Sequence, residues 1–329
     1  MPTLKTIDAH VGGSPLRLIV DGFPSPRGQT MCDKRDWARE HADHLRRALI
    51  LEPRGHIDTC AAVLTEAAMP GAHAGVLFMD NDGFGDVSGT GVIAVTTIAL
   101  ERGLVMPGGD GHTVVFDTTA GTVRARATRG NERVERVSFA GVPSFVLHGG
   151  VVVKIGARII RADVAFGGAF YAIVDGESVG VPLDAAHAWQ LRALGQEIVR
   201  AIEPLLTAVH PLESRLQGIH GTIFTGPPHA PGADLRTVAV FADRGLARSP
   251  SGTGAAAILA VLDAIGLLGD TPFVCEGLIG SRLTARVAGR TTVADYSALV
   301  PEVEGSAWIT GDHSLIVDTA DPLADGFRI

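Results

Sequence analysis

The sequence contains few cysteines and few aromatic residues, and it carries no excess of basic charge. Its three cysteines, Cys32, Cys60 and Cys275, share no short spacing, so neither a disulfide framework nor a zinc site is expected. Aromatic residues form 5% of the chain, so small and branched aliphatic residues must supply most of the core. The formal net charge of −8, without a basic cluster, argues against a nucleic-acid partner.

Long hydrophobic runs are also missing. No apolar stretch reaches the length of a membrane span, and residues 1–10 lack the apolar segment of a signal peptide, so we expect a cytoplasmic protein without a membrane partner. Neither nucleotide-binding glycine fingerprint is present, and no histidine or acidic pair has metal-ligand spacing. We therefore expect no cofactor and no metal. A length of 329 residues with 46% hydrophobic content predicts two well-packed lobes.

The most informative feature present is a repeat of four residues. Ser-Gly-Thr-Gly occurs at 88–91 and again at 251–254, about half the chain length apart. Each copy opens an apolar run of helical character, VIAVTTIAL (92–100) and AAAILAVL (255–262). The N-terminus of a helix presents unpaired N–H groups and the positive end of the helix dipole, which suits it to bind an anion. Two such turns predict two lobes that bind one ligand.

The remaining pattern predicts mostly strands. Amphipathic helices are expected over 33–50 and from about 184 to 206, and β-branched runs predict strands elsewhere, including 291–295. A helix that is hydrophobic on nearly all sides must be enclosed. We predict an α/β fold of two similar lobes, residues 1–130 and 131–311, each with strands wrapped around a central apolar helix. The polar stretch 129–133 is the expected boundary, and a segment from about 312 to 329 could return to the first lobe.

Short motifs of one known family follow one another along nearly the whole chain. Each is weak alone, but together and in this order they resemble the proline racemase family. They read IDAHVGGSPLR (7–17), EPRGH (52–56), ALERG (99–103), FGGAFYA (166–172), RSPSGTG (248–254) and ITG (309–311).

The resemblance implies a fold and a substrate class. It implies two similar lobes as in diaminopimelate epimerase, an active site in the cleft between them, and chemistry without a cofactor. Members of the family act at the α-carbon of proline or hydroxyproline, as racemases, 4-hydroxyproline 2-epimerases or trans-3-hydroxy-L-proline dehydratases. The implied partner is a small imino acid, and a homodimer is left open.

The chain departs from the family at both catalytic cysteines. Racemases and epimerases of the family usually carry Cys-Gly-His in the first motif and Pro-Cys-Gly-Thr-Gly in the second. Their two cysteines remove and return the α-proton on opposite faces. Serine stands at both positions here, as Ser88 and Ser251. Ala247 replaces a typical aspartate, and Ala169 stands where epimerases often have an amide.

A serine hydroxyl is a much weaker acid than a thiol. If its pKa lies about five units higher, forming the alkoxide costs on the order of 7 kcal/mol more, whereas the helix dipole contributes roughly 0.3–2 kcal/mol. A serine therefore needs a neighbour that accepts its proton, or it acts as a donor. Because a dehydratase needs only one base and help for the departing hydroxyl, we expect a trans-3-hydroxy-L-proline dehydratase. The alternatives are a 4-hydroxyproline 2-epimerase or proline racemase, and a relic that binds imino acids without turnover.

The two helix starts define the predicted site. Ser88 and Ser251 are the predicted catalytic residues, one on each side of the α-carbon, although each could serve only as an N-cap. The amides predicted to hold the substrate carboxylate belong to Gly89, Thr90, Gly252 and Thr253. The candidates for accepting a serine proton are His10, His56 and His220, while Arg54 is expected to organise a turn with His56.

Overall fold

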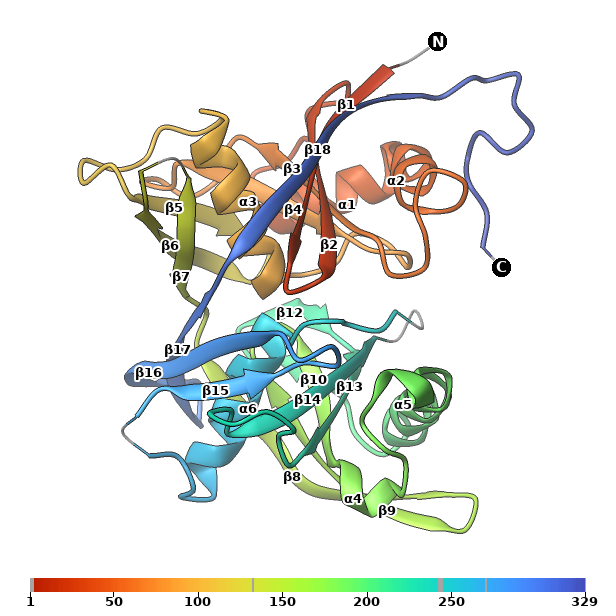
Figure 1. Ribbon diagram of the computed structural model, residues 1–329, viewed down its shortest axis with the longest axis vertical. Coiled ribbons are helices and arrows are strands. Elements are labelled where there is room, and N and C mark those ends of the chain that lie inside the picture. Colours follow the sequence, from red (N-terminus) through yellow and green to blue (C-terminus); the bar gives the residue numbers. More distant parts are fainter. Residues whose placement is uncertain (1–2, 132, 242–244, 270, 329) are drawn as a thin grey trace. The chain divides into compact units, whose positions relative to one another are not determined.

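The chain folds into two compact units (Figure 1). The computed structural model describes residues 3–131, 133–241, 245–269 and 271–328. Unit 1 comprises residues 1–139 and 306–329, and unit 2 comprises residues 140–305. The predicted boundary at 130 precedes strand β7 (Val134–Ala140), and all but the last residue of β7 belongs to unit 1. Glu132, in the predicted boundary stretch, lies outside the described residues.

The strands of unit 1 follow the order β18-β1-β2-β3-β4-β5-β6-β7. Pairs β2–β3 and β4–β5 are parallel, which requires a crossover between the partners, and helices supply both crossovers. The elements of unit 1 besides β7 are β1 (Thr3–Val11), β2 (Ser14–Asp21), α1 (Met31–His41), α2 (Asp43–Ile50), β3 (Cys60–Thr65), β4 (Ala74–Met79), α3 (Gly89–Glu101), β5 (Thr113–Thr118), β6 (Gly121–Arg129) and β18 (Ala307–Ile316).

The strands of unit 2 close on themselves. Their order is β16-β15-β14-β13-β10-β9-β8-β17, and β17 pairs with β16 as well as with β8. The elements of unit 2 are β8 (Ser144–Ile155), β9 (Arg158–Phe166), β10 (Phe170–Asp175), α4 (Gly176–Val179), η1 (Ala185–His187), α5 (Ala188–Ile202), β11 (Val209–His210), β12 (Glu213–Gln217), β13 (Ile219–Gly226), β14 (Leu235–Phe241), α6 (Gly252–Ala264), β15 (Phe273–Glu276), β16 (Arg282–Val293) and β17 (Tyr296–Gly305).

The two units share one sequence of pairings. In unit 2, β10–β13 and β14–β15 are the parallel pairs, with α5 and α6 in the crossovers. These correspond to β2–β3 and β4–β5 of unit 1, with α1–α2 and α3 in the crossovers. Both Ser-Gly-Thr-Gly copies therefore follow the same kind of strand and open the same kind of crossover helix. The four-residue repeat reflects an internal repeat of topology.

Strands surround both apolar helices, as the sequence predicts. All of α3 except Thr90 and Glu101 is buried, and the helix packs against β1, β2, β3, β6 and β18. Helix α6 is buried from Gly252 to Val261 and packs against β8, β9, β10, β16 and β17. The predicted α/β architecture of strands around a central apolar helix is confirmed.

Details of the predicted elements need correction. The expected helix over 33–50 is two helices that meet at Ala42. The expected strand over 291–295 is not separate, because β16 continues to Val293 and a turn at Ala294, with φ of 47°, leads into β17. At the other end, β18 pairs with β1, and a bridge joins Phe327 to Glu52, so the C-terminal segment lies in unit 1 (Figure 1).

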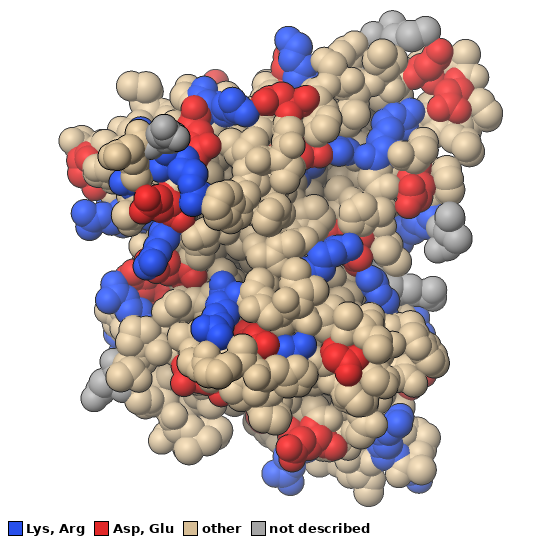
Figure 2. Space-filling model, viewed as in Figure 1, with Lys and Arg blue, Asp and Glu red and all other residues tan. Residues whose placement is uncertain are grey.

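Charged side chains of both signs are interspersed on the surface. On the face drawn in Figure 2, lysines and arginines are mixed with aspartates and glutamates, and neither sign forms a large patch. Over the described part of the chain, every helix is too short or too polar to cross a membrane.

Two glycines in the repeat allow close packing of the buried helices. A Cβ at Gly91 would lie 2.5 Å from Cε1 of Phe78, and a Cβ at Gly254 would lie 2.6 Å from Cδ1 of Ile223. Real Cβ atoms do not approach this closely, so a side chain at either position must displace a core residue. These two glycines thus serve helix packing.

We expect Gly91→Ala and Gly254→Ala to lower the free energy of unfolding by about 1 kcal/mol or more each. Overpacking costs typically 1–3 kcal/mol, which outweighs the helix propensity of alanine, roughly 1 kcal/mol. Gly109→Ala is the control, since its Cβ would meet no heavy atom within 4 Å. Urea denaturation measures the three variants, and equal midpoints would contradict the packing role.

Candidate active site

The two Ser-Gly-Thr-Gly turns have the same local geometry. Ser88 is the N-cap of α3, and its Oγ accepts a hydrogen bond of 3.0 Å from the N–H of Gly91. Ser251 is the N-cap of α6, and its Oγ accepts a 3.0 Å bond from the N–H of Gly254. Both serines have extended backbone angles and are half-buried. Each hydroxyl therefore lies at the positive end of a buried helix.

The serine cap decides which amides of the first turn remain for a ligand. The third amide of each helix, at Gly91 or Gly254, is already bound to the serine. The first two amides of a helix have no acceptor within the helix. In this chain they belong to the four residues predicted to bind a carboxylate, Gly89, Thr90, Gly252 and Thr253.

The threonines of the two turns differ in their surroundings. Thr90 is half-buried, and its Oγ1 lies 3.5 Å from Ser88 Oγ. Thr253 is buried, and its Oγ1 lies 3.3 Å from Ser251 Oγ and 2.7 Å from the Oη of Tyr171. Tyr171 is 1% exposed. The turn in unit 2 thus belongs to a chain of three hydroxyl groups.

Two arginines of α1 hold the loop that leads into Ser88. Arg35 is buried, and its Nη1 donates a 2.6 Å bond to Asp86 Oδ1, two residues before the serine. Arg39 donates a 2.6 Å bond to the carbonyl of Phe84. Burial lowers the pKa of Arg39, with the charge of Arg35 as the next cause, but a guanidinium of this kind stays charged at neutral pH. The loop before α3 is therefore fixed by charge-assisted bonds.

The three histidines predicted as proton acceptors make other contacts. His10 Nδ1 accepts from the N–H of Gly13, and His56 Nδ1 accepts from the N–H of Asp58, so both support turns. The ring of His220 packs edge-on against Tyr171, with centroids 5.6 Å apart. Within the described residues, none of the three hydrogen-bonds to either serine. His220 is the one that approaches the hydroxyl chain.

Residues of the family-like motifs near the N-terminus have structural roles. Arg17 pairs with Asp8 at 2.8 Å and donates to the carbonyls of Leu49 and Arg54. Arg54 donates to the carbonyls of Ile316, Ala48 and Ala324, which holds the C-terminal segment to the end of α2. The side chain of Arg54, expected to organise a turn with His56, thus holds the C-terminal segment instead, while His56 supports the turn at Asp58.

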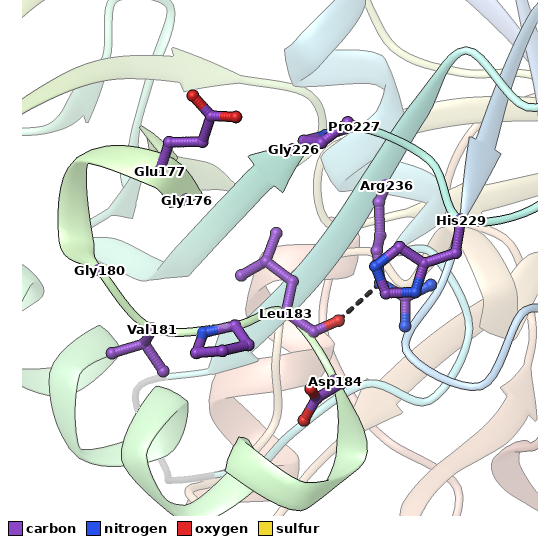
Figure 3. A pocket seen from close by; sticks show the side chains of 11 residues that line it. Gly176, Glu177, Gly180, Val181, Leu183, Asp184, Gly226, Pro227, His229 and Arg236 are labelled. Atoms are coloured by element: carbon purple, nitrogen blue, oxygen red, sulfur yellow. Dashed lines mark hydrogen bonds between the residues drawn. The ribbon is translucent and has the colours of Figure 1, made fainter.

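A separate pocket of about 350 Å³ lies in unit 2 (Figure 3). Its wall includes Arg236, which donates to the carbonyls of Leu183 and Leu278 and pairs with Glu276 at 2.8 Å. Glu276 also accepts the N–H groups of His229 and Ala230. The buried charges of Arg236 and Glu276 beside this pocket are therefore already bound to protein groups. None of the predicted site residues lines the pocket.

Two neighbouring residues on β15 have opposite pKa shifts. Burial by itself would raise the pKa of Glu276, but the hydrogen bonds from Ala230 and His229 and the charge of Arg236 outweigh it, so the pKa is lowered. Burial raises the pKa of Cys275 to about 12. The three cysteines form no disulfide within the described residues. Within the described residues, no group of three or more His, Cys, Asp or Glu could hold a metal ion.

Sequence reasoning missed Tyr171, Arg35 and Glu276. Tyr171 belongs to the motif FGGAFYA, but no sequence signal links it to a threonine more than 80 residues later. A signal did exist for the Arg236–Glu276 pair. Arg236 is a lone charge in an otherwise uncharged strand, LRTVAVF, and such a residue needs a buried partner.

The chain matches known proteins over its whole length. A family model described as proline racemase matches residues 6–328. A trans-3-hydroxy-L-proline dehydratase from Bacillus cereus is 42% identical over 326 residues, which cover 98% of this chain and 97% of the relative. A 3-hydroxyproline 2-epimerase from Burkholderia multivorans is 38% identical over 330 residues, covering 99% and 98%. The crystal structure of a hydroxyproline epimerase from Agrobacterium vitis, with bound trans-4-hydroxy-L-proline, has a TM-score of 0.93 at 31% identity, covering 100% of this chain and 95% of the other.

We expect Glu276→Gln to destabilise the protein by about 3–5 kcal/mol at neutral pH, because it leaves the buried Arg236 charge uncompensated. The lowered pKa of Glu276 means that this stabilisation is present above its unfolded pKa and is lost as the pH falls through its folded pKa. The difference between wild type and variant should therefore shrink in acid.

The control is Glu302→Gln, which removes a partner of Arg286, itself 59% exposed, and should cost less than about 1 kcal/mol. Urea unfolding at several pH values measures both variants. If both substitutions lower the free energy of unfolding by a similar amount, burial does not make the Arg236–Glu276 pair more important than an exposed pair.

Proposed function

The chain belongs to the proline racemase family, and from this premise we propose that it is a trans-3-hydroxy-L-proline dehydratase. The observation that carries the proposal is serine at both helix starts in a chain 42% identical, over nearly its full length, to a relative of that name. In this reaction the C2–H bond breaks and its electrons form a C2=C3 double bond. The 3-hydroxyl departs with a proton as water.

The helix starts suit the carboxylate of such a substrate. Free amides and the positive end of a dipole favour an anion, typically by 0.3–1 kcal/mol and up to about 2 kcal/mol in partly buried sites. The proposal assigns this role to the amides of Gly89, Thr90, Gly252 and Thr253. That Ser88 and Ser251 act on one substrate stays a prediction.

The chemistry of serine favours elimination over racemisation. Racemisation needs a competent base on each face of the α-carbon, and two hydroxyls meet this requirement poorly. Elimination needs one base and one group that donates a proton to the leaving hydroxyl. Serine can perform the second task without ionising first. The proposed enzyme needs no cofactor, and the free thiols accord with a proposed cytoplasmic location.

An epimerase acting on hydroxyproline is the second candidate. It is favoured by the 38% identity to the Burkholderia multivorans relative named as a 3-hydroxyproline 2-epimerase. The binding-only alternative has no support among the relatives described above, which are all named as enzymes.

The reaction can be identified by NMR in D₂O with trans-3-hydroxy-L-proline, the 4-hydroxyproline epimers and proline as separate substrates. Loss of the α-proton signal with formation of a cyclic imine from the 3-hydroxy compound is the expected result. Deuterium incorporation with inversion would instead identify an epimerase or racemase. Binding without exchange of the α-proton would identify a protein that binds imino acids without turning them over.

Ser88→Ala and Ser251→Ala are each expected to lower kcat by at least about 10²-fold, which is the usual contribution of a positioned acid or base. Each also removes an N-cap worth about 1 kcal/mol. Thr30→Ala is the matched control, because it removes the N-cap of α1 with its capping box. If the serine variants retain as much activity as Thr30→Ala at equal stability, the serines are only caps.

A further inference from the structure

The second hydroxyl of each Ser-Gly-Thr-Gly turn distinguishes the two units. In unit 2, Tyr171 Oη, Thr253 Oγ1 and Ser251 Oγ follow one another at 2.7 and 3.3 Å. Unit 1 cannot repeat this arrangement, because the chain has two tyrosines, Tyr171 and Tyr296, and both belong to unit 2. The duplicated scaffold therefore carries a tyrosine-linked serine at one of its two helix starts.

The order of acidity sets the direction of the hydroxyl chain. A phenol, with an ordinary pKa near 10, is a stronger acid than an aliphatic alcohol, so Tyr171 is the natural donor to Thr253. When Thr253 Oγ1 accepts a hydrogen bond from Tyr171, its own hydroxyl hydrogen can be donated to Ser251 Oγ. Ser251 Oγ then accepts from Thr253 and from the N–H of Gly254, which lies 3.0 Å away. With both acceptor positions occupied, the Ser251 proton points away from the helix.

We propose that Tyr171 is a positioning residue that acts through Thr253 and makes Ser251 the proton donor of the pair. This inference rests on the proposed dehydratase function. When the C3–O bond breaks, the Ser251 O–H bond also breaks, and its proton joins the departing hydroxyl to form water. The alkoxide left on Ser251 is stabilised by its two donors and by the dipole of α6. The α-proton leaves to solvent on the side assigned to Ser88, and solvent returns a proton to Ser251.

The surroundings of Tyr171 hold its hydroxyl oxygen beside Thr253. Its side chain is 1% exposed and packs edge-on against His220, which in turn contacts Phe241 with centroids 5.1 Å apart. The packed ring therefore keeps its oxygen beside Thr253 Oγ1. The 3.3 Å step to Ser251 is long for a bond between hydroxyls, and such contacts tighten when charge develops in the reacting complex.

The test replaces the donor and then the leaving group. Tyr171→Phe removes one oxygen and keeps the ring, so kcat for trans-3-hydroxy-L-proline should fall about ten- to a hundredfold with KM changed less than twofold. With trans-3-fluoro-L-proline, whose fluoride leaves without a proton, the same variant should stay within about threefold of wild type. Thr253→Val should show the same selective loss of kcat. Thr253→Ser, which keeps the hydroxyl, should regain most of the lost kcat.

The matched control is Tyr296→Phe, on the remaining tyrosine, whose ring packs against Phe145. It should leave both substrates unaffected. Equal losses by Tyr171→Phe on both substrates would mean that the tyrosine only supports the fold, and no loss on either would remove its role; both results overturn the inference. If wild type forms no product from trans-3-hydroxy-L-proline, the proposed function itself fails, and that result is separate from any variant.

Discussion

A helix enclosed by strands has little bulk water to bind the amides of its first turn, and this constraint shapes both units. A serine hydroxyl meets it by accepting the third amide of α3 and of α6. The glycine that donates this bond also permits the close approach of Phe78 in one unit and Ile223 in the other. The same residues that allow a buried helix to begin therefore leave two amides and a fixed hydroxyl at its positive end. A folding requirement and the proposed anion site share one structure.

The repeat places a serine at the start of a buried helix in each unit. Side chains from other elements then give the two serines different surroundings. In unit 1, Arg35 and Asp86 fix the loop before Ser88. In unit 2, Tyr171 connects to Thr253. A racemase treats the two faces of its substrate alike, whereas a dehydratase removes a proton at one carbon and a hydroxyl at the next. Unequal surroundings at the two serines fit the second kind of chemistry.

Buried and half-buried arginines of this protein hold loops and ends together. Arg54 binds three carbonyls around the C-terminal segment, and Arg236 with Glu276 joins β14 and β15 to the chain around Leu183 and Leu278. Each such group has several partners, which offsets the cost of removing a charge from water. Residues within family-like motifs are thus not all site residues, and several of them are required by the fold.

The sequence alone determined the class of fold, the family and the positions of the two helix starts. It could do so because the repeat, the nearly all-apolar helices and the capping serines are local patterns, readable within a dozen residues. It did not predict the break at Ala42 or the single long strand β16, which depend on packing and register. Only the tertiary structure decided that Tyr171, rather than a histidine, meets the second turn. That contact joins residues distant in sequence, and no local propensity encodes a distance of 2.7 Å between two such hydroxyls.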